Sequence, residues 1–395
     1  MFQKRGEKRQ LSEKSIFWMG VATLLGTIIG AGILGIPYVV AKAGVLYGFF
    51  LMLVLGVAFV FLNLFAGEMV LRTKEQHQLT GYAEKYLGKP GRLFMTLSML
   101  ISIYGALTAY LIGEGAALHA IIKAGAPLLF TLIFFIVGVA IVIKGIRATG
   151  RAELFLILLL LGVIVLIGIL SLPSIQQSNF SVANIPFLFL PYGVILFAFM
   201  GSPAIPVVQE VLGEKKKLMK KVIITASIIP IFLYILFTFF VVGTVGLANF
   251  ELLEPNQRIA TIALQLYTHP LLGLFANLLA VLSMFTSFLT LSTALVEVYQ
   301  YDYRFSRTVA LLLTFSLPLL MVLFKLTTFI AVLGVTGALA GGMDGILITL
   351  MYWKAKVLGD RQPEYSLRKH YVLGGFLILL FSLGIVYQIV TRFLG

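Results

Sequence analysis

The chain has 395 residues, of which 60% are hydrophobic and only 12% are charged, and its formal net charge is +14. Runs of about 20 apolar residues recur along its length, and each is long enough to cross the hydrocarbon core of a bilayer. This composition excludes a soluble globular domain and predicts an all-α, polytopic membrane protein. The chain has no cysteine, so disulfides, thiolate catalysis and cysteine metal sites are excluded as well.

Eleven membrane spans are predicted from the apolar runs. They lie near residues 15–41, 45–71, 93–122, 127–144, 152–171, 186–210, 221–246, 270–300, 306–324, 326–353 and 371–391. With a cytoplasmic N-terminus, most of the 30 Lys and Arg residues fall in cytoplasmic segments, the exceptions being Lys42, Lys123, Arg258, Lys325 and Arg392. The positive-inside rule therefore predicts a cytoplasmic N-terminus, an extracellular C-terminus and a place in the cell membrane. The basic residues form no single face, so no nucleic-acid partner is expected.

The first span contains residues that break a helix. Its centre holds Gly26, Gly30, Gly32 and Gly35, and Pro37 follows. Each glycine costs a helix about 1 kcal/mol and an interior proline about 3 kcal/mol, and exposed backbone groups are costly in lipid unless they face protein, water or a ligand. Gly26 and Gly30 also match a GxxxG packing face, which is the alternative interpretation. The wider cluster favours a helix that unwinds near the midplane to form a binding site.

Ionisable and aromatic residues of the second and third spans are further candidates for functional or structural roles. Glu114 is an ionisable group inside the membrane, and such groups are functional hypotheses by default. Two interpretations remain for it: a carrier of a coupling proton, or a carboxylate of an external vestibule near His119. Tyr110 is a candidate for lining the binding site, with helix packing as the alternative. Glu68 lies four residues before Arg72, which predicts a structural ion pair.

The sixth span is interrupted in the same way as the first. Gly201, Ser202 and Pro203 lie at its centre, and Pro206 follows. The two interrupted spans are five spans apart and begin on opposite sides of the membrane, which predicts an inverted repeat of five plus five helices. No residue-level repeat joins the halves, so this symmetry rests on hydropathy and on the breaks. The expected organisation is a cytoplasmic tail, a first repeat, a second repeat and an eleventh helix with the external C-terminus, at residues 1–14, 15–171, 186–353 and 371–395.

The eighth span carries a stripe of hydroxyl side chains. Ser283, Thr286, Ser287 and Thr290 have the spacing i, i+3, i+4 and i+7, which places them on one helix face. Hydroxyl oxygens, together with carbonyls released by an unwound neighbour, are suitable ligands for a small cation. The alternative is that these hydroxyls bond the carbonyls of their own helix and pack between helices.

Four strings in this chain carry a family resemblance. They are GTIIGAGILGIP in the first span, VILFAFMGSPAIP in the sixth, KKVIITASIIP in the seventh and MFTSFL in the eighth. With these strings the chain resembles the amino acid/auxin permease family of the amino acid–polyamine–organocation superfamily, and the bacterial aromatic and hydroxy amino acid permeases in particular. The resemblance covers essentially the whole chain. It implies the LeuT-type fold of five plus five inverted repeats, in which the first and sixth helices unwind around an α-amino acid.

The resemblance also implies two sets of site residues. Substrate-binding residues carried over by motif are Ile29, Gly30, Ala31, Gly32, Phe197, Phe199, Met200, Gly201 and Ser202, and Tyr110 joins them as a weaker candidate. Cation-binding residues carried over are Gly26, Ile29 and Ser283 through their backbone, and Thr286 and Ser287 through their hydroxyls. The amides and the positive dipole end of a half-helix suit a substrate carboxylate. The Thr-Ser pair alone does not identify the cation, because related proton-coupled permeases keep a similar string. Some proton-coupled relatives in the superfamily have a Lys on the fifth helix near this point; this chain has none there, which favours Na⁺ or an unoccupied site.

These features together predict a secondary active amino acid transporter that couples to Na⁺ or H⁺ by symport and works by alternating access. Its expected partners are an α-amino acid, the coupling cation and the lipid bilayer, and no cofactor is expected apart from Na⁺ as a coupling ion. The alternative is a membrane amino acid sensor, or an exchanger without ion coupling. An enzyme is not predicted, because the chain has only four His and its acidic residues lie mostly in loops.

Overall fold

The computed structural model describes residues 12–145, 150–268, 270–301 and 303–391. Most of the predicted cytoplasmic tail, at residues 1–11, and the predicted external end, at residues 392–395, lie outside the described residues. The described chain is helical and contains no strand, which confirms the all-α class.

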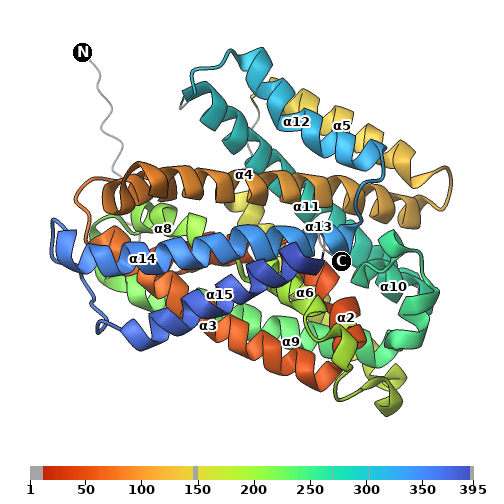
Figure 1. Cartoon of the computed structure of the whole chain (residues 1–395). Coiled ribbons are helices and arrows are strands. Elements are labelled where there is room, and N and C mark those ends of the chain that lie inside the picture. The colour runs from red at the N-terminus through yellow and green to blue at the C-terminus, as the bar shows by residue number, and fades with distance from the viewer. Residues whose placement is uncertain (1–11, 146–149, 269, 302, 392–395) are drawn as a thin grey trace.

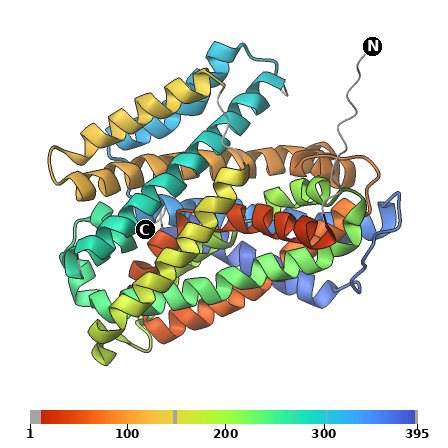
Figure 2. The same cartoon turned by 180° about the vertical axis from the view of Figure 1, so that it is seen from behind.

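Fifteen α-helices make up the described fold (Figure 1). In order they are α1 Glu13–Ile28, α2 Gly32–Ala43, α3 Val45–Leu71, α4 Leu79–Ile122, α5 Pro127–Ile143, α6 Gly150–Ser171, α7 Leu190–Phe199, α8 Ile205–Leu212, α9 Met219–Leu252, α10 Ala260–Tyr267, α11 Pro270–Tyr301, α12 Arg307–Leu323, α13 Phe329–Thr336, α14 Gly342–Leu358 and α15 Tyr371–Ile389. The long helix α4 separates α5 and α12 on one side from α3, α9 and α15 on the other (Figures 1 and 2).

The helices agree with the predicted membrane spans. By length and composition, six described helical segments can cross a membrane, and α1 with α2 forms a seventh candidate with a bend of 53°. One of the six, residues 190–252, contains the predicted sixth and seventh spans, and three shorter apolar helices supply the predicted fourth, fifth and ninth. Each of the eleven predicted spans therefore has a helical counterpart.

The first span breaks where its glycines are most closely spaced. Helix α1 ends at Ile28, Ile29 is extended with φ −84° and ψ 97°, and α2 begins at Gly32. Gly35 and Pro37 lie inside α2 and not in the break. The break is therefore shorter than the cluster of helix-breaking residues suggested.

The second break, in the sixth span, has a similar form. Helix α7 ends at Phe199, Met200 is extended with φ −61° and ψ 119°, and a short turn at Ser202–Ala204 leads into α8. Pro203 and Pro206 both lie in first-turn positions, where a missing N–H group costs nothing. The prolines thus start new helical turns after the break and do not bend a continuous helix.

The two breaks lie against each other, and glycine makes this approach possible. A Cβ atom on Gly32 would lie 2.6 Å from the Cα atom of Ala198, and one on Gly201 would lie 2.4 Å from the Cγ1 atom of Ile28. Carbon atoms in contact normally stay about 3.5–4.0 Å apart. Each break therefore uses a glycine to fit against the other.

A buried carboxylate ties the loop after α14 to the end of α3. Glu68 is completely buried, forms ion pairs with Arg72 and Lys356, and accepts a 2.7 Å hydrogen bond from the amide of Leu367. The predicted Glu68–Arg72 pair is confirmed. The pair is not exposed as an ordinary i, i+4 pair on a helix surface is, because Lys356 and the loop at residues 359–370 cover the carboxylate of Glu68.

Candidate functional site

A cavity of about 500 Å³ leads from the two breaks to one side of the protein. Gly30 and Gly32 of the first break and Phe197 and Met200 of the second line its inner end. At its outer end it is lined by the start of α4 and the end of α11, through Gln78, Leu79, Thr80, Glu297 and Val298. This is the side on which α1 begins, so the breaks are reached from that side.

Side chains of α4 and α11 form most of the cavity wall. They are mainly apolar, namely Met95, Met99, Ile103, Ala106, Leu291 and Ala294. Glu297 and Asp344 are the charged residues among those lining the cavity. The wall can therefore enclose a large apolar group, and its two methionines can adjust to the shape of that group.

A smaller pocket of about 130 Å³ adjoins the cavity at the first break. All five residues of the predicted cation site line it, namely Gly26, Ile29, Ser283, Thr286 and Ser287. Thr27, Gly30, Tyr110 and Leu291 line both the pocket and the cavity. The fold thus brings the predicted cation ligands together beside the predicted substrate site, and their binding of a cation stays a prediction.

The first break leaves backbone groups without backbone partners. Within the described residues, no backbone hydrogen bond is made by the amides of Gly30 and Ala31 or to the carbonyls of Gly26 and Thr27. Unpaired backbone groups within a membrane are costly unless they face protein, water or a ligand. The break therefore offers donors suited to a carboxylate and acceptors suited to a cation or an ammonium group.

The hydroxyl stripe is compatible with both interpretations that the sequence left open. The hydroxyl of Thr286 donates to the carbonyl of Ser283 at 3.0 Å, and that of Thr290 donates to the carbonyl of Thr286 at 3.0 Å. A hydroxyl has one hydrogen and two acceptor lone pairs. These bonds point the hydroxyl hydrogens of Thr286 and Thr290 toward the preceding turn of α11. Lone pairs on the hydroxyl oxygens stay available to a cation.

Tyr110 lies between the pocket and the cavity. Its side chain is buried, and it lines the smaller pocket together with Ser287. A Cβ atom built on Gly30 would lie 3.9 Å from the same hydroxyl oxygen. Tyr110 therefore links the hydroxyl stripe of α11 to the backbone of the first break.

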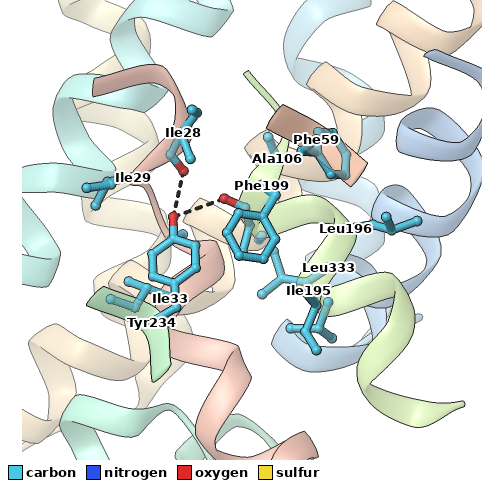
Figure 3. Close-up of a cluster of buried hydrophobic side chains, with 14 of the residues drawn as sticks. Ile28, Ile29, Ile33, Phe59, Ala106, Ile195, Leu196, Phe199, Tyr234 and Leu333 are labelled. Carbon is cyan, nitrogen blue, oxygen red and sulfur yellow. Dashed lines mark hydrogen bonds between the residues drawn. The ribbon is translucent and has the colours of Figure 1, made fainter. Parts of the chain in front are cut away.

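Four of the predicted substrate residues do not line either space. Ala31 is buried, Gly201 faces Ile28, and the hydroxyl of Ser202 donates to Oδ1 of Asn63 at 3.0 Å. Phe199 packs against Phe59 and Tyr234, with ring centroids 6.3 and 5.2 Å away (Figure 3). Phe197 lines the cavity and Phe199 does not, because residues two apart on a helix point about 200° away from each other.

The part of α4 that precedes Tyr110 was not among the predicted site residues. Met95, Met99, Ser102, Ile103 and Ala106 all line the cavity. Their spacing from Tyr110 follows one helical face, so extending that face backwards from Tyr110 identifies them. Leu291 and Ala294 continue the hydroxyl face of α11 in the same manner.

Glu114 lies one turn beyond Tyr110 and is fully buried. Neither carboxyl oxygen has a hydrogen-bond partner among the described residues, and Glu114 lines neither the cavity nor the pocket. The carboxyl is therefore enclosed in this conformation, and both a coupling role and a place in an external vestibule stay predictions for Glu114. The same lack of a partner is found for the Nδ1 atom of His119.

Two pairs of side chains involve the C-terminal part of α2, beyond the first break. Lys42, at the end of α2, forms a 2.7 Å ion pair with Glu251, at the end of α9. Arg258 donates to the hydroxyl of Tyr38 at 3.0 Å and lies 5.0 Å from the centre of its ring. These contacts hold α2 against the segment between α9 and α10, and none of the four residues lines the cavity.

Comparisons with known proteins agree with this architecture. A model of the tryptophan/tyrosine permease family matches residues 13–391. The chain is 29% identical to tyrosine-specific transport system 1 of Haemophilus influenzae, covering 85% of this chain and 88% of that protein. It is 27% identical to glutamine transporter 2 of Aliivibrio fischeri, with coverages of 80% and 83%. A crystal structure of MhsT in complex with L-phenylalanine superposes with a TM-score of 0.68 at 16% identity, covering 95% of this chain and 98% of that one.

Proposed function

The chain belongs to the tryptophan/tyrosine permease family, and from this premise we propose that it moves an α-amino acid together with a cation, Na⁺ or H⁺, by alternating access. The resemblance seen in the sequence is confirmed by the family match, and the LeuT-type fold is confirmed by the likeness to MhsT. The chain is a transport protein and not an enzyme.

The geometry of the first break supports an α-amino acid as substrate. The unpaired amides after Ile29 suit its carboxylate, and the free carbonyls of the same break suit its ammonium group. The side chain of the substrate would then extend along the apolar wall of α4, past Ile103 and Met99. We propose an aromatic amino acid, because this wall is wide and apolar and because methionine sulfur makes favourable contacts with aromatic rings.

The smaller pocket supports the cation as the second substrate. Backbone carbonyls of Gly26, Ile29 and Ser283 and the hydroxyls of Thr286 and Ser287 would hold Na⁺. Gly30 lines both the pocket and the cavity. A cation that fixes the backbone of the first break would therefore also fix the position of the amides that bind the substrate carboxylate. A cation that binds one conformation better than the other shifts the population toward that conformation.

The proposed orientation places the N-terminus in the cytoplasm and the C-terminus outside. With this orientation the cavity opens to the cytoplasm, and the described conformation faces inward. The proposed repeats are residues 15–171 and 186–353, each beginning with one broken helix. Rocking of these repeats around the breaks is the expected motion.

Proton coupling through Glu114 is the second candidate for the cation. Its burial and its two unpaired carboxyl oxygens favour a group that gains and loses a proton and not one held in a permanent ion pair. Sensing without transport, or exchange without a cation, is the alternative function.

The observation that carries the proposal is the adjoining pair of spaces at the first break, one lined by hydroxyls and one by apolar side chains. Its test is uptake by proteoliposomes across a panel of amino acids, with a Na⁺ gradient and an H⁺ gradient imposed separately. We expect L-tyrosine or L-tryptophan to accumulate under one of the gradients. Exchange of labelled amino acid without any response to a gradient would identify an exchanger, and the absence of both would leave a sensor.

A further inference from the structure

Tyr234, in the middle of α9, joins the two breaks. Its hydroxyl donates to the carbonyl of Ile28 and to the carbonyl of Ala198, each at 3.0 Å (Figure 3). Ile28 is the last residue of α1, and Ala198 is the last but one of α7. One side chain therefore bonds the ends of both broken helices.

The two carbonyls depend on this hydroxyl. The last carbonyls of a helix have no partner within the helix and need one from elsewhere. In the described chain, no backbone amide donates to the carbonyl of Ile28 or of Ala198 across its break. The hydroxyl of Tyr234 has one hydrogen, which the two carbonyls share. The ends of α1 and α7 are therefore held at the same point, and a movement of either end changes the hydrogen bond to the other.

Packing fixes the ring of Tyr234 at this point. The side chain is fully buried, and its ring lies 5.2 Å from that of Phe199, which in turn contacts Phe59 of α3. Tyr234 lines neither the cavity nor the smaller pocket. It is therefore placed to position the breaks from behind and not to touch a ligand.

A second contact on the same side supports this arrangement. Asn63 of α3 accepts a 3.0 Å hydrogen bond from the hydroxyl of Ser202 and donates to the hydroxyl of Ser227 of α9 at 3.1 Å. Asn63 is fully buried as well. Helices α3 and α9 thus present polar groups to both breaks from the face opposite the cavity.

We propose that Tyr234 is a positioning residue that fixes the two breaks relative to each other, so that the substrate groups of both are set together. This inference rests on the proposed function. Without the hydroxyl, only packing holds the ends of α1 and α7, so both ends are more mobile in the free protein. Substrate binding must then fix their positions. Ordering that is needed on binding lowers affinity.

The test compares Tyr234→Phe with Tyr192→Phe in the full-length protein. Tyr192 is also buried and donates to a helix carbonyl, that of Leu380 at 2.9 Å, but it lies at the far end of α7. Binding of L-tyrosine is measured with the purified protein, and KM and Vmax of its uptake are measured in proteoliposomes. Size-exclusion profiles and melting temperatures without ligand report on folding.

We expect Tyr234→Phe to raise the Kd and the KM for L-tyrosine about tenfold, which is the effect of leaving a buried carbonyl of the site unpaired. Vmax and the melting temperature should stay near those of Tyr192→Phe, whose Kd should match the wild type. An unchanged Kd for Tyr234→Phe would overturn the inference, and so would an equal rise in both variants. If the wild type binds no amino acid of the panel, the proposed function fails and this inference fails with it.

Discussion

Gly32 is the position where a single methyl group tests the contact between the two breaks. In Gly32→Ala the new Cβ atom would lie 2.6 Å from the Cα and 2.8 Å from the Cβ of Ala198. Carbon atoms need about 3.5 Å, so α2 and α7 must separate by about 1 Å. The neighbouring atom is backbone and cannot turn aside. Overpacking of this kind costs typically about 1–3 kcal/mol.

Two measurements check this prediction. Thermal unfolding in detergent should show a loss of stability, and uptake by proteoliposomes should fall at least tenfold, because the amides of the first break move away from the second break. Gly162→Ala is the matched control, since a Cβ atom on Gly162 meets nothing within 4 Å. It should be neutral, or more stable by up to about 1 kcal/mol, because alanine favours a helix. Wild-type stability and uptake in Gly32→Ala would refute the close packing of the breaks.

Three further predictions address the cation and the loop after α14. Thr286→Ala should raise the Na⁺ concentration for half-maximal uptake about tenfold, the effect of losing one ligand oxygen; an unchanged Na⁺ response would exclude this pocket as the site. Glu114→Gln should abolish uptake driven by an H⁺ gradient and leave uptake driven by Na⁺, and unaltered H⁺-driven uptake would remove Glu114 from coupling. Glu68→Ala should lower the free energy of unfolding by about 3–5 kcal/mol, because it leaves Lys356 buried without its counter-charge. Glu84→Ala, which breaks an exposed pair, should cost less than about 1 kcal/mol, and equal melting of the two variants would contradict this reasoning.

Local chemistry explains why sequence patterns predicted the positions of the two breaks so closely. Glycine and proline act on the backbone of the helix that contains them, so their effect on Ile29 and Met200 follows from local chemistry alone. The hydroxyl stripe of α11 is equally local, since helical periodicity sets which residues share a face. These patterns predicted the two broken helices, the all-α class and the hydroxyl stripe, whereas the full set of cation-binding residues was implied by the family resemblance.

The direction of side chains around the breaks was not predictable in this way. Phe197 and Phe199 were both predicted to bind the substrate, yet only Phe197 lines the cavity. Ser202 resembles a ligand in its motif, but it bonds Asn63 on the face away from the cavity. The packing of α3 and α9 against α7 decides which face of this short helix lines the cavity. The spacing of residues within α7 does not predict that packing.

The sequence by itself determined where the backbone opens, because the free energy of breaking a helix is set by the residues at the break. Only the tertiary structure decided what holds the opened ends. Tyr234 lies 206 positions from Ile28 and 36 from Ala198 along the chain, and no local pattern joins them. A buried carbonyl requires a hydrogen-bond donor, but it does not specify which helix supplies that donor. The fold supplies it from α9, where the hydroxyl of Tyr234 bonds the carbonyls beside both breaks.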